Sequence, residues 1–458
     1  MSVTAPKLDE LLTQAEQVVE RARGRGADVA EAFVRQGAHL TAKVRLGQAE
    51  LVEEASFRAI GLRVMRGQQV AVTSTSDLTP HGIKRFVEDA VELAQLSQPD
   101  PFAGPPDPAQ LSRAEQHADV DAFDGSVDDL DAKRALELAT ASEKAALATD
   151  PRLSNSDGAS VTRISSASAL VTSGGFRGAS RGTYASLVVS PVAQDEDGKK
   201  RSGHYWSARR HLADLEDPEE VGVEAGRRTI AKLGARKIAT QEVPVIFDPE
   251  TGRSIIGLLA GCVQGGAIWR RASYLVERLG TRVASELVRI VDDPLIARGP
   301  GSRAFDGEGL LSRRNVVVDQ GELKTFLLDS YGARKLEATS TASAARGSAG
   351  GVGVATSNFV LQPGVPSPEQ LQERSERALL VTELMGFGFH AVTGDFSRGA
   401  GGFWIENGER AFPVSEVTIS LNLDELLQRI DAIANDLDLR TSTACPTFRV
   451  SSMTVAGK

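Results

Sequence analysis

Residues 157–210 alternate between apolar and polar side chains through three segments, VTRISSASALVTS, TYASLVVSPVAQ and KKRSGHYWSARR. Because successive side chains of a strand point to opposite faces, each segment is predicted to be a strand with one polar face. The tetrapeptide DEDG at 195–198 predicts a turn between the last two segments. We therefore expect an antiparallel sheet that packs one face on a core and leaves the other face hydrated.

Helical patterns flank this sheet in the N-terminal half. Residues 60–65 and 70–75 are predicted to be the strands of a hairpin, with Gly67 in its turn. The dipeptide at 79–80, threonine followed by proline, predicts a helix start, because threonine can cap the first turn and proline fits the first helical position. The predicted helices are 8–22, 80–96, 127–149 and 217–233.

A second pattern begins at EVPVIFDP, residues 242–249. It predicts a short buried strand that leads into a helix capped by Asp248, with Pro249 at the first helical position. The stretch SIIGLLAGCVQGGAIWRRAS (254–273) is apolar enough to be one buried helix. Strand patterns dominate after it, so the C-terminal half is predicted to be mainly β and opened by an apolar helix.

The length of 458 residues is too great for one ordinary core, so more than one domain is expected. The pattern of predicted helices and strands changes near 236–242, and we place the domain boundary there. We predict an α+β protein with two domains. The first, 1–240, is an N-terminal α/β domain with an antiparallel sheet and long helices, and the second, 241–458, is the mainly β domain.

Composition disfavours several classes of function. A net charge of −9 and a pI of about 5.4 argue against direct nucleic-acid binding, which needs clustered lysine and arginine. The longest near-apolar run, 255–268, is too short to span a membrane. The N-terminal sequence lacks a basic stretch followed by an apolar run, so no secretory signal is expected. Two cysteines far apart predict no disulfide framework, and together these features predict a cytoplasmic protein.

Cys262 is a candidate nucleophile. A reactive cysteine needs a base or a nearby cation to form its thiolate, whereas Cys262 lies among glycine, leucine and valine in the apolar stretch. A structural role as a small apolar side chain is therefore favoured. An independent hydrolase that uses Cys262 or distant histidines stays open as an alternative.

Gly257, Gly261 and Gly265 recur every four residues in the same stretch. Each costs about 1 kcal/mol relative to alanine in a helix interior, so another interaction must offset that cost. Their spacing puts them on one ridge of the predicted helix, where a second backbone could approach closely. A cavity wall made without side chains is the competing interpretation.

The remaining polar residues give no clear metal or phosphate motif. The nearest two of the six histidines are seven residues apart, so no helical pair of metal ligands is present. The glycine-rich stretch RGSAGGVGVATS, which begins at Arg346, lacks the Lys-Ser/Thr of a phosphate loop and is predicted to be a mobile or cavity-lining loop. Asp395, Ser397 and Arg398 are polar residues beside glycines, and a turn that leads into a strand also explains them.

The C-terminal half carries an ordered set of motifs. They are FDGEG (305–309), DSYGARKLEATSTA (329–342), VTELMG (381–386), TGDFSRGAGGFWIENGE (393–409) and PVSEVTI (413–419). In this order they resemble the TldD/PmbA family, whose members were once labelled modulators of DNA gyrase. The likeness covers most of 242–458 and extends more weakly into the N-terminal half.

The family has two branches that work together as a heteromeric protease. The TldD branch carries HExxxH on a helix, with a downstream cysteine as a further zinc ligand, whereas the PmbA or TldE branch lacks that motif. The segments SRGAGGFWIENGE and STA resemble the PmbA branch. The resemblance puts Ala260 and Gly265 at the histidine positions and Gly261 at the glutamate position, so we expect no metal and no catalytic residue in this chain. Cys445 falls in the region of the cysteine ligand, but the local match is poor and no ligand role is transferred to it.

The resemblance implies a partner, a TldD-like subunit whose HExxxH would hold zinc, and a peptide or unfolded protein as substrate. The two subunits would enclose a cavity that this chain helps to shape. Candidate cavity or peptide-binding residues are Cys262, Arg346, Asp395, Ser397 and Arg398. A homodimer of the isolated chain stays open, as does a regulatory binding protein that acts on a topoisomerase or a toxin–antitoxin component.

Overall fold

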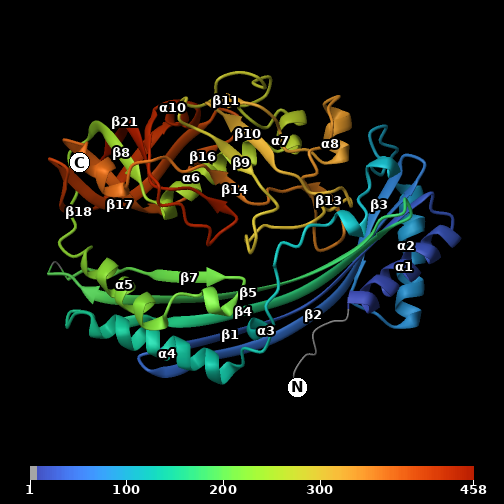
Figure 1. The fold of residues 1–458 in the computed structure, drawn as a ribbon, viewed down its shortest axis with the longest axis horizontal. Coiled ribbons are helices and arrows are strands. Elements are labelled where there is room, and N and C mark those ends of the chain that lie inside the picture. The colour runs from blue at the N-terminus through green and yellow to red at the C-terminus, as the bar shows by residue number, and fades with distance from the viewer. Residues whose placement is uncertain (1–7, 197, 458) are drawn as a thin grey trace.

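The structure is a computed structural model that describes residues 8–196 and 198–457. Figure 1 shows two halves, a long curved sheet with helices against it and a β-rich unit above it. The curved sheet belongs to the N-terminal half and the β-rich unit to the C-terminal half. These separate sheets and helices confirm the predicted α+β class. Residue 197, part of the predicted turn at 195–198, lies outside the described residues.

The N-terminal half is built on an antiparallel sheet. The strand order is β3-β2-β1-β4-β5-β6, and β7 also pairs with β5. The alternating segments correctly predicted β4 and β5, whereas the third segment is divided into two short strands, β6 and β7. The strands are β1 (Val29–Arg45), β2 (Gln48–Arg66), β3 (Gln69–Thr75), β4 (Asn155–Thr172), β5 (Arg177–Gln194), β6 (Lys200–Ser202) and β7 (Tyr205–Arg209).

Strand β1 and most of β2 were not predicted from the sequence. They are 17 and 19 residues long and pair along their whole length, through a turn in which Leu46 and Gly47 have positive φ. The first half of β2 is exposed and forms an edge of the sheet, because β3 pairs only with the residues from Ile60 to Arg66. Backbone hydrogen bonds to β1 hold it as a strand, so its sequence shows little apolar alternation.

Helices of the N-terminal half cover one face of this sheet. Helices α1 and α2 share one apolar core with the sheet, and α4 and α5 share another with a different part of it. The predicted helix at 127–149 is wrong in its first part, because α3 ends at Asp128 and Asp131 caps a separate α4. The helices are α1 (Leu8–Gly24), α2 (Pro80–Leu96), α3 (Gly125–Asp128), α4 (Ala132–Ala148) and α5 (Pro218–Ile230), with short 3-10 helices at Pro108–Gln110, Ala114–Gln116 and Leu212–Asp214.

The opposite face of the sheet turns toward the C-terminal half. The Tyr184 hydroxyl of β5 donates a hydrogen bond to the carbonyl of Arg440. Gly61 of β2 lies against the backbone of Gly350, so close that a side chain at this position would collide with it. The two halves therefore meet over this face of the sheet.

The C-terminal half contains a closed barrel. Strands β15, β8, β21, β18 and β17 are neighbours in that order, and β17 pairs back with β15. A smaller sheet, β11-β10-β9-β14-β20, accompanies it. The strands are β8 (Gln241–Phe247), β9 (Ile290–Asp292), β10 (Asn315–Asp319), β11 (Glu322–Leu323), β12 (Ala344–Arg346), β13 (Val352–Val354), β14 (Phe359–Leu361), β15 (Arg377–Met385), β16 (Phe389–His390), β17 (Asp395–Glu406), β18 (Glu409–Asn422), β19 (Ile430–Ile433), β20 (Thr443–Ala444) and β21 (Phe448–Ala456). The helices are α6 (Pro249–Cys262), α7 (Gly265–Trp269), α8 (Ser330–Lys335), α9 (Pro368–Glu373) and α10 (Leu423–Gln428).

Helix α6 follows the first barrel strand and is buried in the core of this half. Asp248 caps it as predicted, and its carboxylate accepts a hydrogen bond of 2.8 Å from the Thr251 backbone N–H. The prediction of one helix over 254–273 is wrong, because α6 ends at Cys262 and α7 begins at Gly265. Between them the backbone of Gln264 is extended, and the Gly265 N–H donates to the Leu327 carbonyl at 2.8 Å.

Within the described residues, no helix is both long and apolar enough to cross a membrane.

Candidate functional site

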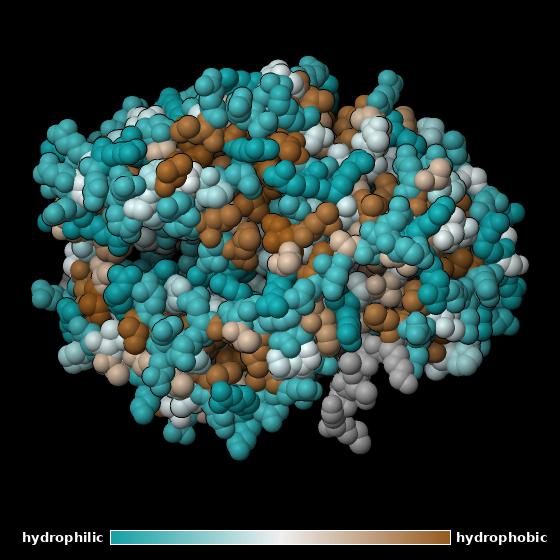
Figure 2. Space-filling model, viewed as in Figure 1, coloured by the Kyte–Doolittle hydropathy of each residue, from teal (hydrophilic) through white to brown (hydrophobic). Residues whose placement is uncertain are grey.

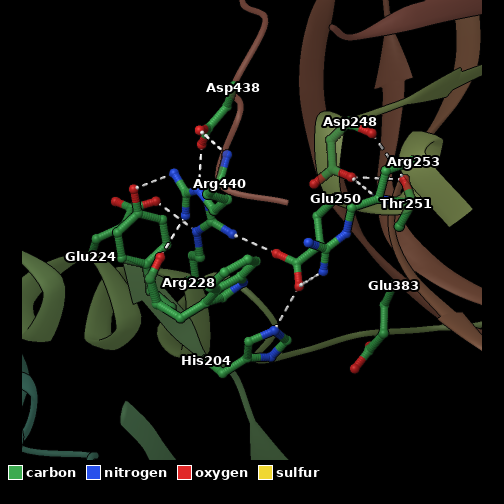
Figure 3. Close-up of polar contacts among 12 residues, drawn as sticks. His204, Glu224, Arg228, Asp248, Glu250, Thr251, Arg253, Glu383, Asp438 and Arg440 are labelled. Carbon is green, nitrogen blue, oxygen red and sulfur yellow. Dashed lines mark hydrogen bonds and ion pairs between the residues drawn. The ribbon is translucent and has the colours of Figure 1, made fainter. Parts of the chain in front are cut away.

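A polar cleft lies between the two halves, where α5 and β7 face the N-terminal end of α6. Two adjoining cavities of about 210 and 270 Å³ occupy it, and Arg228, Asp248 and Glu250 line both. The surface is hollowed at the left of Figure 2, between the two halves. Figure 3 shows the polar side chains that meet in the cleft. They come from both halves, so the site exists only when the halves are docked.

Glu250 is the central carboxylate of this cleft (Figure 3). Its oxygens lie 2.8 Å from His204 Nε2, 3.6 Å from Arg228 Nη1 and 3.8 Å from Arg253 Nη2. Burial acts to raise the pKa of Glu250, but the hydrogen bond and charge of His204 and the charges of Arg253 and Arg228 outweigh it and lower the pKa to about 2. Glu250 is therefore ionised at neutral pH, and it joins α6 to α5 and to His204, the residue before β7.

Arginine and aromatic side chains alternate across the same junction, and we call this group the arginine–aromatic stack. Its members, in spatial order, are Arg228, Tyr205, Arg440, Trp206 and Arg253. The guanidinium carbons lie 4.6 and 5.0 Å from the centre of the Tyr205 ring, and 5.2 and 4.9 Å from that of Trp206. Each contact is a cation–π interaction, and stacking of this kind strengthens when water is excluded.

Additional ion pairs surround the stack. Glu224 accepts a hydrogen bond of 2.7 Å from Arg228, and Arg440 is paired with Asp438. At the other side of the cleft, Lys232 of the N-terminal half lies 3.2 Å from Glu383 of β15. These pairs neutralise most of the arginine charge, so the charges of the cleft are largely compensated.

Hydrogen bonds and ion pairs connect the polar side chains of the cleft. Its carboxylates and arginines satisfy one another, and the hydroxyl of Thr251 donates a hydrogen bond of 2.7 Å to the Asp248 carboxylate. In the described part of the chain, no group of three or more His, Cys, Asp and Glu side chains is arranged to hold a metal ion.

The positions that the resemblance aligned with HExxxH lie at the end of α6 and the start of α7. Ala260 is buried, with 6% of its surface exposed, while Gly261 is exposed and Gly265 is buried. None of these residues has a side-chain donor atom, so they do not fit a zinc ion, which needs nitrogen, sulfur or oxygen ligands. The break between α6 and α7 also means that the three positions do not lie on one continuous helix.

The predicted close packing along the glycine ridge is wrong for Gly257 and Gly261. A Cβ atom added at either position would have no atom within 4 Å. Only Gly265 is tightly packed, where an added Cβ would lie 2.5 Å from Leu328 Cδ2. The competing interpretation, a wall without side chains, agrees with the open space beside Gly257 and Gly261.

Both cysteines are core side chains. Cys262 and Cys445 are each 1% exposed. Burial raises the pKa of the Cys262 thiol to about 11, and it raises that of Cys445 well above its ordinary value. Both thiols are therefore protonated at neutral pH, as the structural interpretation of Cys262 predicted.

Arg346 takes part in the contact between the two halves. Its side chain is 1% exposed and pairs with Glu31 of β1, which also pairs with Arg63 of β2 at 3.2 Å. The remaining guanidinium donors reach the carbonyls of Gly307 at 2.6 Å and Gly350 at 2.8 Å. The stretch that begins at Arg346 is thus anchored at its start by a buried ion pair.

Asp395, Ser397 and Arg398 lie on β17 and do not form one site. Asp395 and Ser397 are exposed, and the Asp395 carboxylate accepts a hydrogen bond of 2.6 Å from Thr393. Arg398 points to the opposite face, where its Nη1 donates to Ser254 Oγ of α6 at 2.7 Å. Its Nε is buried without a hydrogen-bond partner among the described residues.

The residues of the cleft were not singled out from the sequence. His204, Tyr205 and Trp206 lie in the predicted segment KKRSGHYWSARR, where the adjacent aromatic residues were the only signal. Arg440 is more than two hundred residues away in the sequence. Only the docking of the two halves brings these side chains together.

Three regions of the chain match the models of one protein family. Residues 240–457, 125–233 and 30–94 match the models described as the PmbA/TldA metallopeptidase C-terminal domain, central domain and domain 1. Metalloprotease PmbA of Escherichia coli O157:H7 is 35% identical over 451 residues, which cover 98% of this chain and 96% of that protein. The chain belongs to the PmbA/TldD family. Within this family it lies in the PmbA-like branch.

Other relatives agree with that placement. The PmbA homologue of Haemophilus influenzae is 33% identical, with 98% of this chain and 96% of that protein covered. The TldD homologue of the same organism is 22% identical, with 85% and 82% covered. Two solved structures share the PmbA/TldD fold. TldE from Thermococcus kodakarensis has a TM-score of 0.86, 22% identity and coverage of 97% and 100%. A Bacteroides thetaiotaomicron protein named as a modulator of DNA gyrase has a TM-score of 0.91, 24% identity and coverage of 98% and 99%.

Proposed function

We propose that this chain is the metal-free, PmbA/TldE-like subunit of a heteromeric zinc metallopeptidase that acts in the cytoplasm on peptides or unfolded proteins. Its partner is a TldD-like subunit that carries HExxxH and the zinc ion. The proposal rests on the absence of zinc ligands at the end of α6 and the start of α7 in a chain of a metallopeptidase family. The chain belongs to a metallopeptidase family, yet Ala260, Gly261 and Gly265 offer no ligand and no general base.

This chain contributes a binding surface and a rigid frame to the assembly. When the partner holds zinc, the metal acidifies a bound water for attack on a peptide carbonyl. The residues of this chain perform other tasks. The arginine–aromatic stack and Glu250 hold the two halves in one relative position, and the open space beside Gly257 and Gly261 leaves room for a polypeptide.

Reconstitution tests the proposal. The chain and a TldD-like subunit are purified separately and mixed, and cleavage of an unstructured fluorogenic peptide is followed. Activity is expected only with both chains, and it should vanish when the glutamate of the partner's HExxxH is replaced by glutamine. Cys262→Ala in this chain should leave cleavage within a few-fold, because the thiol is buried and protonated. Full activity of the partner alone, or the absence of a complex in size-exclusion chromatography, would contradict the proposal.

Elemental analysis of the isolated chain provides an independent check. Less than a tenth of a zinc ion per chain is expected. One tightly held zinc that is lost on chelation together with peptidase activity would contradict the assigned role. The same chromatography run shows whether the isolated chain forms a homodimer.

The alternative functions predict different results. A cysteine-dependent hydrolase needs a thiolate, which the burial of Cys262 and Cys445 opposes. A regulatory binding protein would leave its client intact when the partner is present. Following a topoisomerase subunit or an antitoxin by gel electrophoresis in the reconstituted mixture separates binding from cleavage.

A further inference from the structure

The cavity of about 210 Å³ in the polar cleft has an apolar floor. Leu380 of β15 lies opposite Phe403 of β17, and both residues line the cavity. Successive side chains of a strand point to opposite faces, so these two lie on the barrel face away from Leu379 and Trp404, which belong to the main core of this half. Leu380 and the partly buried Phe403 pack in a smaller apolar cluster with Ile246, Ala378 and Ile405. The floor can therefore contact an apolar group of a ligand.

Most charged side chains that line this cavity are paired with a carboxylate or a base of the same chain. The pairs are Arg227 with Glu224, Arg228 with Glu224 and Glu250, His204 with Glu250, and Lys232 with Glu383. Figure 3 shows several of these contacts. A ligand does not need to neutralise the charges of these groups.

Arg410 of β18 lines the cavity and forms no ion pair within the part of the chain that the structure describes. Its Nε donates to Gln372 Oε1 at 3.1 Å, whereas neither of its Nη groups has a hydrogen-bond acceptor among the described residues. The guanidinium carbon lies 5.2 Å from the centre of the Phe403 ring, so the free donors lie beside the apolar floor. Free guanidinium donors of this kind bind a carboxylate strongly.

Two carboxylates of the same cavity, those of Asp248 and Asp436, have no cationic partner within residues 8–196 and 198–457. The backbone N–H and the hydroxyl of Thr251 both donate to Asp248 Oδ1, and Oδ2 receives no hydrogen bond from a described residue. The backbone N–H and the hydroxyl of Thr447 donate to the Asp436 carboxylate at 2.8 and 2.7 Å. Burial raises the pKa of Asp248, and a cation beside Oδ2 would offset this cost of ionisation.

Arg410 and Asp248 lie close to each other across the cavity without forming an ion pair. Burial, followed by the charge of Arg227, lowers the pKa of Arg410, while the charges of Glu369 and Asp248 act to raise it. Glu369 is exposed on α9 and does not line the cavity, so Asp248 is the carboxylate that shares the cavity with Arg410 in this group. A molecule with both an ammonium and a carboxylate can neutralise the two sides at once.

We propose that this cavity binds a free α-amino acid with an apolar side chain. Its carboxylate pairs with the Nη groups of Arg410, its ammonium lies between Asp248 and Asp436, and its side chain contacts Leu380 and Phe403. The volume suits a molecule smaller than the drug-sized ligands that occupy cavities of about 300–1,000 Å³. The inference goes beyond the proposed function, since it needs neither the zinc subunit nor peptide cleavage.

The test is isothermal titration calorimetry of the full-length chain with L-leucine. Leucine is expected to bind with a dissociation constant of about 1 mM or lower. Three control ligands each lack one recognised group. They are leucinamide without the carboxylate, N-acetyl-leucine without the ammonium, and glycine without the apolar side chain. Each should bind roughly ten-fold or more weakly than leucine, equal to about 1.4 kcal/mol.

Variants of the chain locate the site. Arg410→Gln should weaken leucine binding by roughly ten-fold and leave leucinamide binding unchanged, because leucinamide has no carboxylate. Asp248→Asn should weaken leucine binding by a similar factor without loss of the helix cap, since asparagine caps a helix as well as aspartate does. Arg85→Gln, at an arginine on α2 whose side chain is 75% exposed, is the matched control and should have no effect.

Hydrogen exchange on the unmodified chain provides a test that does not depend on the folding of a variant. Leucine should protect amides in α5 and in 403–410, which lie on the two sides of the cavity. Three results would overturn the inference. They are absence of leucine binding, binding of leucinamide or N-acetyl-leucine as tight as that of leucine, and protection only at residues far from this cavity. Equal affinity for leucine in Arg410→Gln and the unmodified chain would likewise contradict the assigned role of Arg410.

Discussion

Glu250 and Glu308 show how surroundings move the same type of carboxyl in opposite directions. Burial acts to raise the pKa of both. At Glu250 the hydrogen bond and charge of His204, with the charges of Arg253 and Arg228, outweigh burial and lower the pKa to about 2. At Glu308, burial and the neighbouring charge of Asp306 raise the pKa to about 7. The stability of the protein should therefore depend on pH through both residues.

Glu250 should stabilise the folded protein above pH 4.5. Because its pKa falls from the ordinary 4.5 to about 2 on folding, the stabilisation is lost as the pH drops from 4.5 through 2. Glu250→Gln should lose less stability over that interval than the unmodified protein. Urea unfolding midpoints between pH 2 and pH 6 measure this, with Glu242→Gln at an exposed position as the control. Identical pH profiles for Glu250→Gln and the unmodified protein would refute the role given to this carboxylate.

Glu308 should act in the opposite sense. Its pKa is raised from 4.5 to about 7, so the folded state retains a proton that the unfolded state has released, and stability falls as the pH rises between these values. Glu308→Gln stays neutral and can still accept the backbone hydrogen bond from Ser330. Melting temperatures at pH 5 and pH 8 should therefore differ less in the variant. A pH dependence unchanged by the substitution would show that Glu308 is ionised throughout.

At the scale of elements, close helix packing through glycine occurs between α4 and α5 instead of along α6. A Cβ atom at Gly222 would lie 2.2 Å from the Ser142 carbonyl oxygen, and one at Gly226 would lie 2.6 Å from Thr149 Oγ1. These glycines are four residues apart on α5, so they face the same side and let α4 approach. The same spacing at Gly257 and Gly261 meets open space.

This difference in packing predicts that replacing glycine by alanine has opposite effects on stability at Gly222 and Gly261. Gly222→Ala should destabilise the protein by roughly 1–3 kcal/mol, because the backbone of α4 must move. Gly261→Ala should be neutral or stabilising by up to about 1 kcal/mol, since alanine is the better helix former and meets no atom. Both are measured by chemical denaturation. A large loss of stability in Gly261→Ala would restore the close-packing interpretation of α6.

At the scale of the whole molecule, local patterns predicted the elements better than their assembly. Alternation predicted β4 and β5, and an Asp-Pro pair predicted the start of α6, because these signals depend on neighbouring residues. The first half of β2 was missed, since it is an exposed sheet edge that only backbone pairing with β1 holds as a strand. The polar cleft was missed because His204, Glu250 and Arg440 meet only after the two halves dock. The assignment to the PmbA-like branch came from the ordered motifs of the C-terminal half, including SRGAGGFWIENGE.

The buried pair of Arg346 and Glu31 joins the halves far from the polar cleft and yields a prediction about their docking. Both side chains are 1% exposed, and Arg63 supplies the second cation. Burial acts to raise the pKa of Glu31, but the two arginines outweigh it, and the pKa is lowered. Arg346→Met leaves a buried carboxylate with one partner fewer, so we expect a loss of about 3–5 kcal/mol in unfolding free energy.

The double variant Glu31→Gln, Arg346→Met separates this charge effect from lost packing. Removing both charges should recover part of the stability, because a buried ion pair replaced by neutral groups leaves no uncompensated carboxylate. Limited proteolysis in the connection between the halves, 231–240, reports their docking. Faster cleavage is expected in Arg346→Met than in the double variant. If both variants are equally destabilised and equally cleaved, the side-chain volume of Arg346 matters more than its charge, and the ion pair is not what joins the halves.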